Sequence, residues 1–356
     1  MPKIITTIPV KNDEWFVENS IRSAVAWSDY VYVADESSDD GSHIIYKRLE
    51  SEYNNLKIIY DRPKFDFNTP DMRNYLLNLA RSIDGNNIIF EMHADEIMSA
   101  DILKNEIRDK LINDMPIGSA LMMPWVNLWG NSEYYRDDNS VWSNNRSWFA
   151  YRDDGKVKFD GPVFHGPRAP ESFLENKIDV NYLQVMHYQF LNLTMERSKQ
   201  ALYQIFERNH YPDKNVEYIN KIYACAFDVR QVNLSKLEEC HCQPWIEKGL
   251  SIDKEYSKNG YNWRDTEVLK NFNKNGLKPY KNLNIWFIDW ENKRQEALDL
   301  GVTCLLTEEI VDPRNLSTKI AHKYLMKYQR YPFWRLDFYK LLVEKMIERV
   351  NKKVFK

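Results

Sequence analysis

Acidic side chains gather at two places early in the chain, each directly after a short apolar run. The first is Asp35–Ser42, Asp-Glu-Ser-Ser-Asp-Asp-Gly-Ser, which follows Tyr30–Ala34. The second is His93–Glu96, His-Ala-Asp-Glu, which follows Ile88–Met92. Carboxylates accept hydrogen bonds from a nucleobase or ribose, and carboxylate with imidazole suits a divalent cation that neutralises a diphosphate. The alternative interpretations are a polar connection for the first and a capped turn for the second.

Arg73 is a third candidate, near the start of a helical segment that Thr69 is expected to cap and Pro70 to begin. A guanidinium at this place can bind a phosphate, or it can pair with a carboxylate. Each of these three motifs is ambiguous by itself, so the functional interpretation depends on their order along the chain.

The elements that must position these residues alternate between strand and helix. The apolar patterns predict strands at Ile4–Pro9, Tyr30–Ala34, Leu56–Tyr60, Ile88–Met92 and Ser119–Val126. They predict helices after a cap at Asn12 or Asp13, over His43–Tyr53, from Thr69 to Arg81, and over Asp101–Ile112. This alternation predicts an α/β fold, a mixed and mostly parallel sheet with helices on both faces. Ligands of such sheets bind beyond the carboxyl ends of the strands, where both acidic clusters fall.

The second half of the chain has a different texture. Aromatic residues crowd between Trp125 and Tyr151, where they either pack in the core or offer flat faces to a ligand. One more strand is predicted at Tyr182–His187 and an isolated one at Asn284–Ile288, while the remaining pattern is helical. We therefore expect a sheet-containing domain over residues 1–193 and a mostly helical C-terminal extension over 194–356.

The composition limits the broad class of the protein. The chain has 356 residues, 49 Lys and Arg against 52 Asp and Glu, and 43% hydrophobic residues, which suits a folded protein and argues against a dedicated nucleic-acid binder. No apolar run approaches the length of about 20 residues that spans a bilayer. The four cysteines are too few for a disulfide framework, and the first residues do not read as a signal peptide, so a cytoplasmic location is expected.

Taken together, the motifs resemble those of family-2 glycosyltransferases over about residues 1–190. The matching segments are the opening strand with Asn12-Asp13-Glu14, the acidic run Asp35–Ser42, the pair Arg73-Asn74, and His93-Ala94-Asp95-Glu96 in the place of an Asp-X-Asp motif. The resemblance implies a GT-A (Rossmann-like) fold and an inverting transfer from a nucleotide-diphosphate sugar, with a UDP-sugar favoured, to a glycan or lipid-linked acceptor.

The resemblance also implies site residues. Those expected at the donor are Pro9, Asp35, Glu36, Arg73, Ala94 and Asp95. Those expected at a metal are Asp95, His93 and His187, the last because Met186-His187-Tyr188 resembles a later His-Tyr of the family. His93 replaces the first Asp of the motif, and since imidazole binds Mn²⁺ better than Mg²⁺, Mn²⁺ is the favoured cation if one is used.

The general base is less well defined. Phe159–Gly166 resembles a family segment in which a glutamate follows the histidine, but Gly166 occupies the place of that glutamate here. Glu171, Asp160 and His165 are the substitutes, in no fixed order. Arg168 joins Arg73 as a candidate for stabilising the leaving diphosphate.

Two further readings of the whole chain remain open. A nucleotidyltransferase on a similar fold would also bind a nucleotide and a metal, although no Gly-rich phosphate loop follows the first strand. A degenerate binding module would keep the fold without chemistry. Separately, residues 319–356 hold 11 Lys and Arg against three Asp and Glu, interleaved with aromatic residues. This segment predicts either peripheral contact with the inner face of an anionic membrane or a helix packed on the protein.

Overall fold

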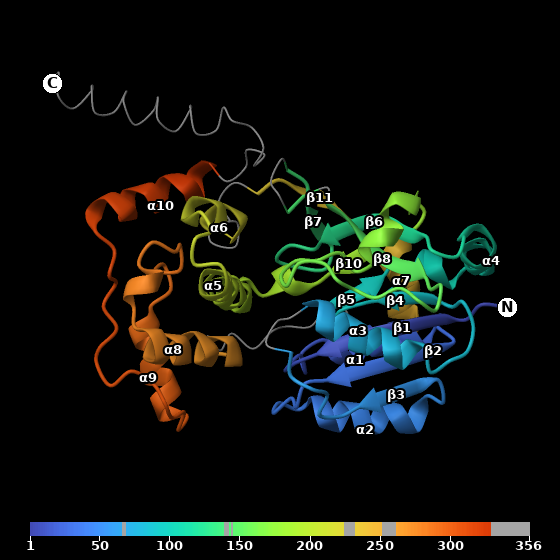
Figure 1. Ribbon diagram of the computed structural model, residues 1–356, viewed down its shortest axis with the longest axis horizontal. Coiled ribbons are helices and arrows are strands. Elements are labelled where there is room, and N and C mark those ends of the chain that lie inside the picture. The colour runs from blue at the N-terminus through green and yellow to red at the C-terminus, as the bar shows by residue number, and fades with distance from the viewer. Residues whose placement is uncertain (66–68, 139–141, 144, 224–231, 251–260, 329–356) are drawn as a thin grey trace, which may run out of the picture. The chain divides into compact units, whose positions relative to one another are not determined.

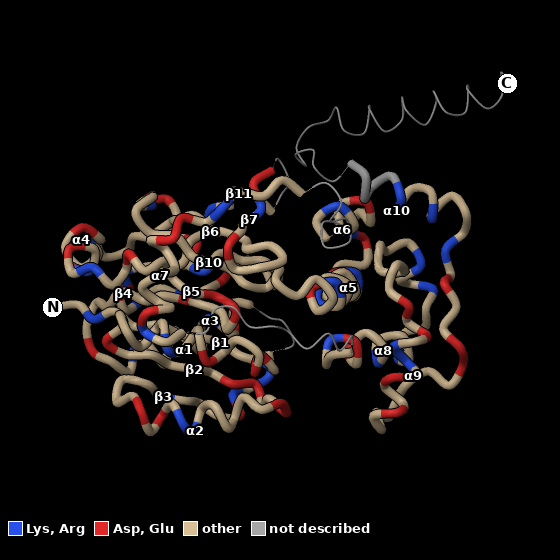
Figure 2. Tube along the Cα trace, turned by 180° about the vertical axis from the view of Figure 1, so that it is seen from behind, with Lys and Arg blue, Asp and Glu red and all other residues tan. Residues whose placement is uncertain are grey.

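The computed structural model describes residues 1–65, 69–138, 142–143, 145–223, 232–250 and 261–328 (Figure 1). These residues form two compact units, which are described separately. The first comprises the described parts of Met1–Tyr135, Asn144–Leu191 and Ser235–Tyr256, and the second those of Arg136–Ser143, Asn192–Leu234 and Ser257–Lys356. Acidic and basic positions are interspersed along the described trace of both units (Figure 2).

The first unit is built on a nine-stranded sheet. Its strands are β1 (Ile4–Val10), β2 (Tyr30–Asp35), β3 (Leu56–Ile59), β4 (Ile88–Glu91), β5 (Glu96–Met98), β6 (Ala120–Asn127), β8 (Asn145–Arg152), β9 (Lys177–Asp179) and β10 (Val185–His187). The order is β3-β2-β1-β4-β8-β6-β10-β5, with β9 also paired to β6. Strands β1 to β4 are mutually parallel where they pair, β8 is antiparallel to β4 and β6, and β5 is antiparallel to β10. A separate pair joins β7 (Tyr134–Arg136) to β11 (Leu234–Lys236).

Helices cover both faces of this sheet because successive strand residues point to opposite sides. Ile4 and Ile8 of β1 are buried in a core that includes residues of α1 (Val17–Val25) and α2 (Ser42–Glu52). Ile5, between them, is buried instead in a core with Leu77 and Ala80 of α3 (Thr69–Ala80). The prediction of a mixed, mostly parallel α/β sheet with helices on both faces is confirmed.

The remaining helices of the first unit lie near the later strands. They are the 3-10 helices η1 (Ala100–Leu103), η2 (Glu171–Asn176) and η3 (Gln189–Leu191), and the α-helices α4 (Asn105–Asp114) and α7 (Glu239–Glu247). The predicted helix over Asp101–Ile112 is therefore two shorter elements.

The predicted cap of the first helix is wrong. Helix α1 begins at Val17 with Phe16 as its N-cap, and no side chain caps it. The amide of Asn12 is used elsewhere, on Asp39 of the acidic loop, and Asn12 itself has a left-handed φ of 52°.

The second unit is helical, as the sequence pattern predicts for the region after the sheet. Its described helices are α5 (Leu193–His210), α6 (Val216–Tyr223), α8 (Trp263–Asn275), the 3-10 helix η5 (Lys278–Tyr280), α9 (Trp290–Asp299) and α10 (Leu316–Tyr328). They enclose a core that includes Phe272, Trp286 and Trp290. The predicted strand at Asn284–Ile288 is wrong, because this segment forms turns held by indole hydrogen bonds to Tyr280 O and Ile285 O.

Two segments depart from the expected single break after residue 193, because Arg136–Ser143 belongs to the second unit and Ser235–Tyr256 to the first. The first unit regains α7, whose Trp245 is fully buried and donates through Nε1 to the carbonyl of Met98 at 2.8 Å. Among the described residues, no helix is long and apolar enough to cross a membrane. Most of the basic segment 319–356 lies outside the described residues, so the predicted membrane contact stays a prediction.

Candidate active site

The acidic loops follow strands that are neighbours in the sheet. Strands β2, β1 and β4 are neighbours and run parallel, so their carboxyl ends lie side by side at the same end of the sheet. Val10 pairs in register with Asp35, and Thr7 with Glu91. Asp35–Ser42 and His93–Glu96 therefore leave the sheet on the same side, as the sequence predicts.

Hydrogen bonds fasten the loop after β1 to the loop after β2. The Asn12 side chain donates to Asp39 Oδ1 at 2.7 Å and accepts from the Asp39 backbone N–H at 2.9 Å. The Asn12 backbone N–H donates to Ser38 Oγ at 2.8 Å. Lys11 Nζ donates to the carbonyls of Glu36 and Ser37 at 2.8 Å each. These bonds hold the backbone of the acidic loop in one conformation.

Asp35 is the buried centre of that loop. Its carboxylate accepts from the Ser38 backbone N–H at 2.8 Å, from Ser38 Oγ at 2.6 Å and from the Tyr46 hydroxyl at 2.9 Å. His43 Nε2 lies 3.2 Å away. Asp35 has no exposed surface, so its oxygens organise the loop from within.

Glu36 lies nearer the surface, and its side chain is 21% exposed. Its carboxylate pairs with Arg62 Nη2 at 2.8 Å, and Arg62 also donates to the carbonyls of Ala34 and Pro63. Pro9 lies next to this position, in register with Ala34. Asp35 and Glu36 are both predicted to contact the nucleotide-sugar donor, and only the carboxylate of Glu36 is accessible.

Arg73 forms a buried ion pair with Glu91. Its Nε donates to Glu91 Oε2 at 2.8 Å and its Nη2 to Oε1 at 3.0 Å, while Nη1 donates to the Gly166 carbonyl at 2.7 Å. Burial alone would raise the pKa of Glu91, but the charge of Arg73 and the nearby His93 outweigh it and lower that pKa to about 2. Of the two roles considered for Arg73, this geometry is that of a pair with a carboxylate.

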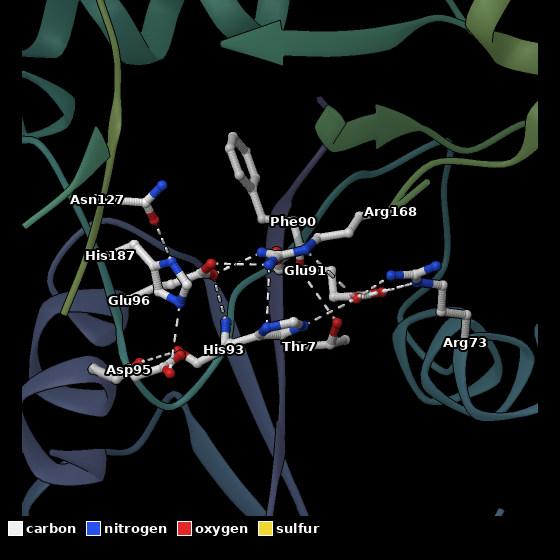
Figure 3. A network of polar contacts seen from close by, with 11 residues as sticks. Thr7, Arg73, Phe90, Glu91, His93, Asp95, Glu96, Asn127, Arg168 and His187 are labelled. Atoms are coloured by element: carbon white, nitrogen blue, oxygen red, sulfur yellow. Dashed lines mark hydrogen bonds and ion pairs between the residues drawn. The ribbon is translucent and has the colours of Figure 1, made fainter. Parts of the chain in front are cut away.

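Arg168 forms an ion pair with Glu96, the last residue of the turn His93–Glu96. Its guanidinium donates to both oxygens of Glu96, at 2.6 and 2.8 Å, and its Nη2 lies 3.1 Å from His93 Nδ1 (Figure 3). Burial raises the pKa of Glu96, yet Arg168 keeps it below its ordinary value. The side chain of Arg168 also lies over the rings of Trp125 and Phe149.

The two predicted metal ligands of the turn face different partners. His93 directs Nε2 towards Glu91 Oε1 at 3.5 Å. Asp95 instead faces His187, whose Nε2 lies 3.5 Å from Asp95 Oδ2 (Figure 3). The antiparallel pairing of β10 with β5 brings them together, because it sets His187 opposite Glu96. Ala94, between the two predicted ligands, is buried.

Asn127 orients the imidazole of His187. Its Oδ1 lies 2.9 Å from His187 Nδ1, and the two residues pair in register across β6 and β10. An amide oxygen accepts, so Nδ1 carries a proton and Nε2 is the ring nitrogen that faces Asp95. Trp125 stacks on the same ring, with centroids 4.7 Å apart.

A carboxylate oxygen and an imidazole nitrogen at this separation can both bind one divalent cation, and Mn²⁺ accepts this pair of ligand types. The partner on the far ring nitrogen is the arrangement by which proteins fix the tautomer of a metal-binding histidine. Asp95 and His187 therefore fit the predicted cation, whereas the ring of His93 is directed to Arg168 and Glu91.

Two of the three candidates for the general base line one small pocket. Asp160 and Glu171 line it together with Arg73. Gly161 also lines it, and a Cβ at Gly161 would lie only 2.5 Å from Glu171 Oε1, so a larger residue there would displace the glutamate. Through Arg73 and Glu91 the pocket is connected to the turn that carries His93.

His165, the third candidate base, is exposed and does not line this pocket. Its φ of 55° lies in the left-handed region, which is uncommon for residues other than glycine, although histidine adopts it more often than most. Trp129, which belongs to the aromatic stretch between Trp125 and Tyr151, is buried and stacks on Phe190. Trp142 is half-buried.

Sequence reasoning missed three residues of this network. Glu91 is a charged residue at the end of an otherwise apolar strand, and that contrast was a usable signal for a buried ion pair. Asn127 and Arg62 gave no such signal. Their roles depend on strand register and on contacts between separate loops.

No protein-family model and no curated protein matches the sequence. Several solved structures align with it. S. aureus TarS 1-349 has 14% identity over 84% of this chain and 92% of that chain, with a TM-score of 0.36. The mannosyltransferase PcManGT from Pyrobaculum calidifontis, in complex with GDP-Man and Mn²⁺, has 15% identity over 60% and 65%, with a TM-score of 0.36.

A 4-diphosphocytidyl-2C-methyl-D-erythritol synthase has 13% identity over 43% of this chain and 73% of that chain, with a TM-score of 0.26. Such low identities and TM-scores carry no argument about donor, acceptor or mechanism. The chain resembles solved GT-A glycosyltransferase structures at low identity.

Proposed function

We propose that this protein is a glycosyltransferase that moves a sugar from a nucleotide-diphosphate sugar, with a UDP-sugar favoured, to a glycan or lipid-linked acceptor. The observation that carries the proposal is the pairing of Asp95 with His187 at the edge of the sheet where the acidic loop also emerges. A cation site beside a loop that can contact a nucleoside is what binding of a nucleoside diphosphate requires.

The nucleoside is assigned to the loop after β2. Glu36 supplies an accessible carboxylate that accepts hydrogen bonds, and Lys11 and Arg62 hold the loop and the carboxylate in place. Asp35 contributes by fixing the turn from inside. Pro9 and Ala94 shape the neighbouring backbone at the ends of β1 and β4.

The diphosphate is assigned to Asp95 and His187, which would hold a divalent cation, Mn²⁺ in preference to Mg²⁺. When bound, such a cation supplies positive charge against the leaving diphosphate. Arg168 keeps the turn that carries Asp95 in place through its bidentate pair with Glu96. Arg73 acts in the same way through Glu91, and its charge lies at the pocket wall.

The attacking hydroxyl of the acceptor is assigned to the pocket lined by Asp160 and Glu171, which has room for one group of about the size of a water molecule. In an inverting transfer, one carboxylate takes the proton of the acceptor hydroxyl. The hydroxyl oxygen attacks the anomeric carbon as this happens, and the bond from that carbon to the diphosphate breaks on the opposite side. We assign this role to Glu171, an exposed residue whose carboxylate lies against Gly161 at the wall of the pocket. A lipid-linked acceptor would agree with membrane contact through the basic segment 319–356, at the inner face of a membrane in the cytoplasm.

Turnover of a panel of nucleotide sugars tests the proposal. The full-length chain is incubated with each donor and with Mn²⁺ or a chelator, and release of the nucleotide is measured. We expect release from a UDP-sugar with Mn²⁺, strongly reduced by Asp95→Asn. The exposed Asp84→Asn, which removes one carboxylate elsewhere on the first unit, is the matched control.

The same assay separates the alternatives. Release of pyrophosphate from a nucleoside triphosphate would favour a nucleotidyltransferase. Donor binding without turnover, across the panel and a set of glycan acceptors, would favour a binding module that lacks chemistry. Nucleotide release equal with and without Asp95 would contradict the assignment of the site.

A further inference from the structure

The start of helix α7 carries a second cluster of ligand-type side chains, away from the residues of the candidate active site. Glu238 is the N-cap of this helix, and Cys240 and His241 lie in its first turn. One donor atom from each residue lies within 4.8 Å of the others. Among the described residues, this is the only group of three or more His, Cys, Asp or Glu side chains with that spacing.

The spacing is that of a tetrahedral site. Cys240 Sγ lies 3.7 Å from Glu238 Oε2, and His241 Nε2 lies 3.9 Å from the same oxygen. Zinc binds sulfur, nitrogen and oxygen at about 2.0 to 2.3 Å, so ligand atoms at the corners of its tetrahedron are about 3.3 to 3.8 Å apart. The observed separations need only small side-chain adjustments to match, and the exposed Glu238 and Cys240 are free of packing constraints that would prevent them.

The histidine of this cluster is already oriented by a carboxylate. His241 Nδ1 lies 2.9 Å from Asp101 Oδ2 of η1, which leaves Nε2 as the atom directed to Glu238. Asp101 is itself held by Lys104, whose Nζ donates to Oδ1 at 2.8 Å. A carboxylate on the far nitrogen is the usual support of a zinc-binding histidine, because it fixes the tautomer and raises the basicity of the ligating nitrogen.

We propose that Glu238, Cys240 and His241 form a Zn²⁺ site, with Asp101 as the positioning residue of the histidine and with water in the fourth position. The thiolate and imidazole favour zinc over the Mn²⁺ or Mg²⁺ that oxygen-rich sites take. Binding converts the Cys240 thiol to a thiolate, and its proton passes to the solvent. This site is independent of the proposed glycosyl transfer.

The position of the site gives it a structural consequence. Asp101 follows β5, the strand that begins directly after Asp95, and Trp245 of α7 donates to Met98 O in that strand. Zinc on His241 would therefore fasten the start of α7 to η1 through the pair with Asp101. Because only the folded chain assembles these ligands, Zn²⁺ should raise the melting temperature.

Metal titration of the full-length, metal-free chain tests the proposal. Zn²⁺ is added in competition with a chromophoric chelator, and Co²⁺ is added separately as a spectroscopic probe of thiolate binding. Because Zn²⁺ can also occupy Asp95 and His187, the stoichiometry is measured in Asp95→Asn, where we expect one Zn²⁺ per chain, a sulfur-to-cobalt charge-transfer band, and a higher melting temperature with Zn²⁺. Cys240→Ser should remove all three signals, and Asp101→Asn should weaken Zn²⁺ binding by about 10- to 100-fold.

Cys304→Ser is the matched control, because Cys304 is also an exposed free cysteine but belongs to the second unit. It should leave Zn²⁺ affinity unchanged, as should Asp95→Asn at the candidate active site. The proposal is overturned if Cys240→Ser binds Zn²⁺ as tightly as the unaltered chain, or if Co²⁺ gives no charge-transfer band. Melting temperatures without metal show whether each variant is folded, and Glu238→Gln provides a second ligand variant on the exposed surface.

Discussion

His187 Nε2 lies 3.5 Å from Asp95 Oδ2, although the two residues come from distant parts of the chain. The strand β10 carries His187 to the end of β5, and the turn before β5 presents Asp95 to it. The opposite ring nitrogen is held by Asn127. The pair combines the ligand types and the spacing for one divalent cation, so several consequences can be measured.

Asn127 should control metal affinity without touching the metal. Asn127→Leu removes the acceptor that fixes the proton on His187 Nδ1, and we expect Mn²⁺ affinity to fall by about 10- to 100-fold. Asn127→Asp keeps an acceptor at the same place and should retain most of the affinity. Titration followed by electron paramagnetic resonance of free Mn²⁺ measures both. Equal affinity in the unaltered chain and the Leu variant would contradict the role of Asn127.

Glu91 should make stability depend on pH in the acid range. Its pKa is lowered from 4.5 to about 2 in the fold, since Arg73 outweighs the effect of burial. The ionised carboxylate therefore stabilises the fold above pH 4.5, and this contribution is lost as the pH falls towards 2. The difference corresponds to about 3 kcal/mol at about 1.4 kcal/mol per pKa unit.

Urea unfolding at a series of pH values measures this effect. Glu91→Gln should flatten the acid limb of the stability curve, while the exposed Asp84→Asn should leave its shape unchanged. Arg73→Met leaves the Glu91 carboxylate without its main partner and should cost about 3 to 5 kcal/mol at neutral pH. An acid limb of equal slope in Glu91→Gln would show that other groups dominate.

Asp35 and Glu36 should separate stability from binding. Asp35→Asn cannot accept all the hydrogen bonds of the buried carboxylate, and we expect a loss of about 2 to 3 kcal/mol in the free energy of unfolding. Glu36→Gln loses its charge, and it should weaken UDP binding about tenfold. It should cost less stability than Asp35→Asn, because the amide oxygen still accepts a hydrogen bond from Arg62. Calorimetry of UDP binding beside urea unfolding distinguishes the two, and the reverse pattern would exchange their roles.

Glu171 and Asp160 should differ in turnover. If Glu171 is the base, Glu171→Gln lowers the turnover number by at least about 100-fold at unchanged donor affinity, whereas Asp160→Asn has a small effect. Gly161→Ala should lower the turnover number less than Glu171→Gln, because the added methyl group makes the exposed carboxylate shift but does not remove it. A large loss in Asp160→Asn alone would move the assignment to Asp160.

The sequence was sufficient to predict the parallel part of the sheet and the side on which its acidic loops emerge. Apolar strands such as Ile4–Val10 and Ile88–Glu91 have local patterns that packing reinforces. The helix cap expected at Asn12 or Asp13 is not formed, and the side chain of Asn12 instead donates to Asp39 in the loop after the next strand. Local pattern carries no information about such a partner.

The side-chain pairs of the site were harder to predict for the same reason. That Asp95 faces His187, while His93 faces Glu91 and Arg168, depends on the register of β5 against β10. Short strands of three residues give almost no periodic signal. The family resemblance therefore indicated Asp95, His93 and His187 as candidate ligands, whereas the partner of each side chain is known only from the fold.

Calorimetry of UDP binding to the full-length chain, with Mn²⁺ and with a chelator, is the sharpest test of the cation site at Asp95. We expect binding that requires Mn²⁺ and that weakens at least about tenfold in Asp95→Asn, the loss of one strong charge contact. The same affinity for UDP in the unaltered chain and in Asp95→Asn, with or without Mn²⁺, would contradict it.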